Sequence, residues 1–182
     1  MSTLELEAAV QRDPKNVQGW YSLGVKQQDN EREQKAIEAL RRAVELDPEH
    51  VQSWLALGVS HTNESSRAKA YGAICGWVKR HPKFPQTTVG SSGGFTVEVF
   101  EPGSERSQKA MYDGLIACLI EIIRNASGDE KEHRIDPDVQ VALAVLLNSN
   151  QEYAKATDCF LTALAVRPHV RSSQNLCTRD AL

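Results

Sequence analysis

The sequence predicts an all-α fold: a solenoid of antiparallel helix pairs, interrupted by a long hinge segment. The first observation is a proline that returns every 34 residues, at Pro14, Pro48 and Pro82. The second is that tryptophan, leucine and glycine recur with the same period, as Trp20, Leu23 and Gly24 and again as Trp54, Leu57 and Gly58. A fixed period of this length is typical of arrays in which each unit stacks on its neighbours.

The order of residue types within the period is that of the tetratricopeptide repeat. Small residues let two antiparallel helices approach closely, large residues fill the space between them, and proline ends the second helix because it lacks an N–H donor. A third copy precedes Pro168, with Gln140 where the first two have tryptophan, and half a copy with Leu6 comes before the first. We therefore predict a repeat block over residues 1–82 and a further repeat over residues 135–168. An ordinary helical bundle would not keep this register.

Residues 83–134 do not fit the repeat. Phe84-Pro85 and the glycine-rich residues 90–94 predict a helix stop and a flexible loop, and residues 95–100 alternate as a short strand or an extended segment would. From about residue 105 to 125 one apolar face recurs at helical spacing. That face consists of Met111, Leu115, Cys118, Leu119, Ile122 and Ile123. We expect a loop followed by one helix that acts as a hinge.

Residues 169–182 match no repeat. Because no polar capping helix follows Pro168, the last predicted helix would leave its outer apolar residues bare, namely Phe160, Leu161, Leu164 and Val166. Solenoids usually need a polar cap for solubility. The sequence therefore predicts a fragment, a truncated gene product or a splice form.

Composition narrows the classes of function. The formal net charge of −3 over 182 residues argues against nucleic acid, which binds basic faces. No apolar stretch is long enough to span a bilayer, and the N-terminus does not resemble a secretory signal. The four cysteines, Cys75, Cys118, Cys159 and Cys177, are too widely spaced for a zinc site or a disulfide framework and fit a reducing compartment. We expect a cytoplasmic protein that needs no cofactor.

No catalytic constellation is recognisable. The five histidines are not grouped with a nucleophile and an acid, and no Lys-Ser or Lys-Thr follows the glycines as in a phosphate loop. We expect no enzyme. His61 is interpreted as a hydrogen-bonded, partly buried residue and Trp77 as core packing.

The concave side is predicted to carry short polar groups where the first helix of each copy ends. These are Gln28 and Asp29, then Thr62 and Asn63, then Asn148 and Ser149. An asparagine amide contains donors and an acceptor, so it can pair with the N–H and C=O of an extended peptide. Asp29, Glu31 and Glu64 could attract a basic side chain on that peptide. Equally, Asn63 could merely end a helix turn and Asn148 could be a solvated residue.

Several segments resemble the repeat domain of the peroxisomal import receptor for type 1 targeting signals, over about residues 4–168. They are Glu38–Leu46, Val59–Ser65, Ile135–Gln140 and Glu152–Phe160. The resemblance implies a cytoplasmic receptor that binds C-terminal Ser-Lys-Leu-type signals of peroxisomal matrix proteins and cycles to the peroxisomal membrane.

The resemblance also implies residue roles. Asn63 would contact the peptide backbone, Thr62 and Glu64 would lie beside it, and Asn148 would be another groove asparagine. Regions that meet the docking machinery at the membrane, and later repeats that face the cargo carboxylate, have no counterpart in this sequence. We therefore expect weak binding, or none, by this chain alone. The alternatives are a generic repeat scaffold for protein–protein interaction and a non-functional truncated product.

Overall fold

The computed structural model describes residues 2–82, 105–126 and 136–166. These residues form eight helices and confirm the all-α prediction. The helices are α1 (Thr3–Arg12), α2 (Val17–Asp29), α3 (Glu33–Leu46), α4 (Val51–Asn63), α5 (Arg67–Arg80), α6 (Glu105–Ala126), α7 (Pro137–Ser149) and α8 (Tyr153–Val166). The segment expected to alternate at 95–100 and the unmatched residues 169–182 lie outside the described part of the chain.

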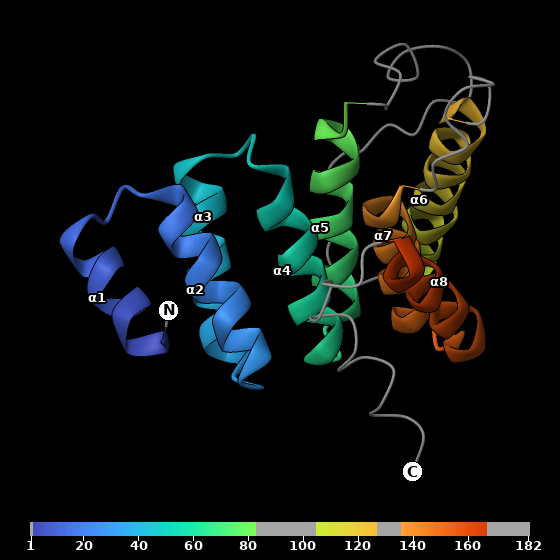
Figure 1. Cartoon of the computed structure of the whole chain (residues 1–182). Coiled ribbons are helices and arrows are strands. Elements are labelled where there is room, and N and C mark those ends of the chain that lie inside the picture. Colours follow the sequence, from blue (N-terminus) through green and yellow to red (C-terminus); the bar gives the residue numbers. More distant parts are fainter. Residues whose placement is uncertain (1, 83–104, 127–135, 167–182) are drawn as a thin grey trace.

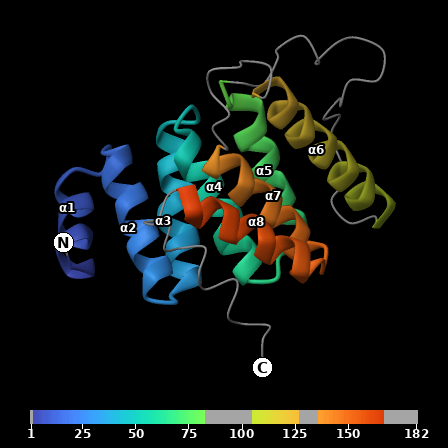
Figure 2. The same cartoon turned by 45° about the vertical axis from the view of Figure 1, so that its right-hand side comes forward.

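The helices form stacked pairs. Figure 1 shows α1 to α5 following one another across the molecule, with α2 paired to α3 and α4 paired to α5. A third pair, α7 with α8, packs against α4 and α5. Helix α6 contacts α5 and α7 and extends to one side of the stack, which Figure 2 shows. The inserted helix therefore lies beside the array and does not separate its pairs, because α4 and α5 contact α7 directly.

The signature tryptophans hydrogen-bond the first two pairs to the turns before them. The indole Nε1–H of Trp20 donates to the carbonyl of Pro14 over 2.9 Å, and that of Trp54 donates to Pro48 over 2.8 Å. A buried or half-buried indole needs such an acceptor. The repeated Trp–Pro spacing thus reflects one repeated hydrogen bond, and the third copy has Gln140 at this position.

The turn inside each pair has one geometry in all three copies. Glu31, Ser65 and Gln151 adopt φ values of 56°, 55° and 67°, the left-handed conformation that closes many helix ends. The following amide donates back to the helix each time; for example, Ser66 N lies 2.8 Å from His61 O, and Glu152 N lies 2.9 Å from Leu147 O. The third pair is therefore a true copy of the first two.

The largest apolar cluster joins α4, α5, α6, α7 and α8. Trp77 is 1% exposed, which confirms core packing. The predicted apolar face of α6 belongs to the same cluster, with Met111 and Ile123 partly buried at its edge. The expectation for Phe160 was wrong, because Phe160 is 1% exposed. It falls on the stripe of Ala156 and Ala163, at helical spacing, that packs inward. Leu161 and Val166 are 57% and 47% exposed, as expected.

Candidate functional site

A polar hollow of about 130 Å³ lies between the α4–α5 turn and the α7–α8 turn. Its lining residues are Thr62, Ser65, Arg67, Asn148, Ser149, Gln151 and Tyr153. All of them carry hydrogen-bonding side chains, and Arg67 is the charged one. In the described residues Arg67 has no hydrogen bond or ion pair. The structure thus brings together two of the four predicted site residues, Thr62 and Asn148, from helices far apart in sequence.

Thr62 and Ser149 join the two sides of this hollow. The Thr62 hydroxyl donates to Gly58 O over 3.0 Å and lies 3.0 Å from the Ser149 hydroxyl. Because the single Thr62 proton is used within α4, Ser149 is the donor in the second contact. Repeats that are separated by the whole inserted segment are therefore hydrogen-bonded to each other at the site.

Asn63 and Glu64 point to a different neighbour. Asn63 is the last residue of α4, and its Nδ2 donates to the Glu33 carboxylate at the start of α3 over 2.6 Å. Glu64 accepts a hydrogen bond from Gln34. Neither residue lines the hollow. The side chain of Asn63 thus links two repeats, and the predicted peptide contact of Asn63 stays a prediction.

The expectation that Gln28 lines the concave side was wrong. Gln28 is 2% exposed, and its Nε2 donates to Ala56 O and to the Ser60 hydroxyl over 2.8 and 2.7 Å. An amide of this length reaches across to the next pair and satisfies a carbonyl of α4. Asp29, in contrast, is solvent-accessible, and its Oδ2 lies 3.8 Å from Lys26 Nζ.

Four lining residues were not predicted: Ser65, Arg67, Gln151 and Tyr153. The sequence does contain a signal for two of them, because Ser65 and Gln151 hold the same position of the repeated turn. Arg67 and Tyr153 follow at the starts of α5 and α8. Positions just after each turn therefore face the hollow as well as positions just before it.

Glu152 organises the α7–α8 turn beside the hollow. Its carboxylate accepts from Lys155 Nζ over 2.6 Å, from the Tyr112 hydroxyl over 2.6 Å and from Asn150 Nδ2 over 2.9 Å. These hydrogen bonds, with that of Lys155 the largest, lower the pKa of Glu152 to about 2. Burial, followed by the same hydrogen bond, raises the pKa of Tyr112.

His61 is buried near the site, as expected, but it is not fully hydrogen-bonded. It is 7% exposed, and its Nδ1 has no partner among the residues that the structure describes. Burial, with smaller effects of Lys69 and Arg41, lowers the pKa of His61 below 6.5. Burial of the ring therefore disfavours its protonated form.

The described residues contain no group of three or more His, Cys, Asp or Glu that could hold a metal ion. Cys75, Cys118 and Cys159 carry free thiols, and Cys177 lies outside the described residues. Among the helices of the described ranges, none combines the length and the apolar character needed to cross a membrane.

The sequence of this chain is similar to those of known proteins. The tetratricopeptide-repeat model matches residues 17–50. The PEX5-related protein of Rattus norvegicus is 35% identical over 176 residues, which are 96% of this chain and 28% of that protein. The peroxisomal targeting signal receptors of Yarrowia lipolytica and Candida albicans are 36% and 32% identical, each over 92% of this chain and 26% of the receptor. This chain contains a tetratricopeptide repeat and is similar to these proteins over most of its own length.

This chain spans little more than a quarter of the length of these relatives. The homology nevertheless extends over almost all of its own length, so both turns that line the hollow fall in the homologous region. The predicted resemblance is thereby confirmed.

Proposed function

We propose that this chain is the peptide-binding repeat segment of a peroxisomal import receptor. It would hold C-terminal Ser-Lys-Leu-type signals of matrix proteins in the polar hollow that Thr62 and Asn148 line. The observation that carries the proposal is the polar hollow, to which two separate repeats contribute neutral donors and acceptors, and Arg67 a positive charge. The relatives' names, PEX5-related protein and peroxisomal targeting signal receptor, support the same role.

Peptide recognition at this site needs no chemistry on the cargo. Amide and hydroxyl groups pair with the peptide backbone, and the guanidinium of Arg67 favours an anionic group. Asn63 and Glu64 would contribute from the end of α4, directly after Thr62, with Asn63 held by Glu33. As part of such a receptor, the chain would act in the cytoplasm and at the peroxisomal membrane.

A second candidate is a repeat scaffold for protein–protein interaction. The observation that favours it is the exposure of two large apolar side chains of α8, because Leu161 and Val166 are 57% and 47% exposed. Large exposed apolar side chains often mark contact surfaces. This candidate predicts no preference for a peptide with a free C-terminus.

The test is fluorescence anisotropy with a labelled peptide ending in Ser-Lys-Leu, compared with the same peptide amidated at its C-terminus. We expect the free acid to bind more tightly. Asn148→Ala should weaken binding about tenfold, the usual effect of one or two lost hydrogen bonds. Asn30→Ala is the matched control, because Asn30 lies in the turn of the first pair and contacts Thr3. Equal affinity for acid and amide, or equal effects of the two variants, would contradict the proposal.

A further inference from the structure

The side chain of Tyr112 links helix α6 to the turn beside the candidate site. The Tyr112 hydroxyl donates to Glu152 Oε1 over 2.6 Å, in the turn that joins α7 to α8. The ring of Tyr112 also packs on that of Tyr71 in α5, with centroids 5.9 Å apart. Tyr71 is 1% exposed, so the Tyr112 ring is fixed against a rigid part of the core.

Glu152 lies in the middle of the α7–α8 turn, whose residues form one wall of the hollow. The lining residues Asn148 and Ser149 precede it at the end of α7, and Gln151 and Tyr153 flank it directly. Gln151 has a φ of 67°, which is unfavourable for a side chain with a Cβ and needs support from its surroundings. Backbone hydrogen bonds close this turn as they do in the other two pairs, and the hydrogen bonds that converge on the Glu152 carboxylate, one of them from another helix, add to them.

We propose that Tyr112 positions the α7–α8 turn, and with it one wall of the hollow, by holding the Glu152 carboxylate. Tyr112 is a positioning residue, since it does not line the hollow itself. The inserted helix thereby becomes a brace for the site. This inference deepens the proposed peptide-binding role, which it takes as its starting point.

The other partners of Glu152 cannot supply the same constraint. Asn150 belongs to the turn itself, and Lys155 is one helical turn away in α8, with its side chain 73% exposed. Both move with the turn. Tyr112 is the partner anchored in a different element, on the α5 core. Of the charged groups in the described part of the chain, Lys155 acts on this carboxylate.

The test compares three single variants. Tyr112→Phe removes the hydroxyl and keeps the ring contact with Tyr71. Tyr71→Phe removes a hydroxyl from the same ring pair and keeps the hydrogen bonds of Glu152. Lys155→Gln removes the charged partner of Glu152 and leaves the link to α6.

The primary readout is hydrogen exchange of the Gln151 and Glu152 amides, which donate to Asn148 O and Leu147 O over 2.9 Å each. We expect exchange to become about five- to tenfold faster in Tyr112→Phe, as for loss of a hydrogen bond to a charged group. The two control variants should leave it within twofold of the native rate. The pKa of Glu152, followed by NMR, should rise in both Tyr112→Phe and Lys155→Gln, because each variant removes a hydrogen bond that lowers it. This rise checks that the bond was removed.

Peptide affinity separates this inference from the proposed function. If the native chain binds the Ser-Lys-Leu peptide, Tyr112→Phe should weaken binding at least threefold while the controls do not. If the native chain binds no peptide, the proposed function fails, and the exchange rates still decide the role of Tyr112. Unchanged exchange in Tyr112→Phe, or an equal acceleration in Lys155→Gln, would overturn the inference.

Discussion

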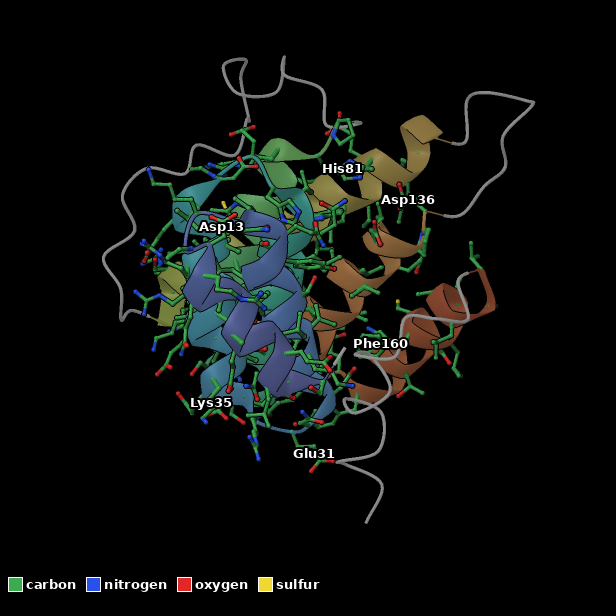
Figure 3. The ribbon with its side chains drawn as sticks, turned by 60° about the vertical axis from the view of Figure 1, so that its left-hand side comes forward. Asp13, Glu31, Lys35, His81, Asp136 and Phe160 are labelled. Carbon is green, nitrogen blue, oxygen red and sulfur yellow. The ribbon has the colours of Figure 1, made fainter. Side chains whose placement is uncertain are left out.

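His81 Nε2 lies 3.7 Å from Asp136 Oδ2, although the entire inserted segment separates these residues in the sequence. His81 follows α5 and Asp136 caps α7, so the two ends of the insertion meet at one point. Figure 3 labels both residues, close to the ends of their helices. This contact explains how the second and third repeats can pack together with an extra helix encoded between them.

The first prediction concerns this contact. A double-mutant cycle with His81→Ala and Asp136→Asn should give a coupling energy of about 0.5–1 kcal/mol in urea unfolding, because both side chains are largely shielded from water. Asparagine also caps helices, so Asp136→Asn should preserve the N-cap of α7.

The control cycle uses Arg80 and Glu49, which lie 3.2 Å apart with Glu49 79% exposed. Such surface pairs contribute little, so its coupling energy should be smaller. A coupling energy of zero for His81 and Asp136 would show that this contact does not hold the ends of the insertion together.

Two glycines in α5 provide the second prediction. A Cβ at Gly76 would lie 2.5 Å from Trp54 Cε3, whereas a Cβ at Gly72 would meet nothing within 4 Å. Gly76→Ala should destabilise the fold by about 1–3 kcal/mol, because the Trp54 ring would have to move. Gly72→Ala should instead stabilise it by about 0.5–1 kcal/mol, the usual gain in a helix interior. Urea unfolding of both variants checks the opposite signs; equal effects would contradict the packing at Gly76.

The repeat itself could be predicted because its residues act locally. Trp54 bonds within its own turn, and glycine at position 58 leaves room for Ile74, one helix away. These constraints recur with the period and are visible in one sequence. The site was harder, because Thr62 and Ser149 meet only after the insertion has been placed to one side. No periodic pattern reports where a non-repeating segment goes.

The fate of the polar residues was unpredictable for a related reason. Gln28 and Asn148 occupy comparable places at the ends of first helices, yet Gln28 is buried against Ser60 and Asn148 lines the hollow. The difference depends on which neighbour packs over each helix end. Arg67 escaped prediction since an arginine that begins a helix is more often a solvated residue than a lining one.

The third prediction tests the link between Asn63 and Glu33. Asn63→Asp would place a carboxylate oxygen against Glu33, which is 8% exposed. The loss of the hydrogen bond together with like-charge repulsion should destabilise the chain by about 2 kcal/mol in urea unfolding. Adding Glu33→Gln to this variant should recover part of the loss, because the new amide can donate to the carboxylate introduced at position 63. An Asn63→Asp variant with the same free energy of unfolding as the native chain would rule out the contact.

The last prediction is a pH dependence of stability that arises from His61. Its pKa is lowered in the fold by burial, so the folded state resists protonation that the unfolded chain accepts as the pH falls through 6.5. The unfolded state then binds more protons, and the free energy of unfolding must decrease as the pH is lowered in that region, by at most about 1.4 kcal/mol per pH unit for one site. His61→Leu removes this site without leaving a polar atom unpaired. Urea unfolding between pH 8 and 5.5 should therefore give a flatter profile for His61→Leu than for the native chain. Parallel profiles would mean that His61 is protonated equally easily in both states, against its burial in α4.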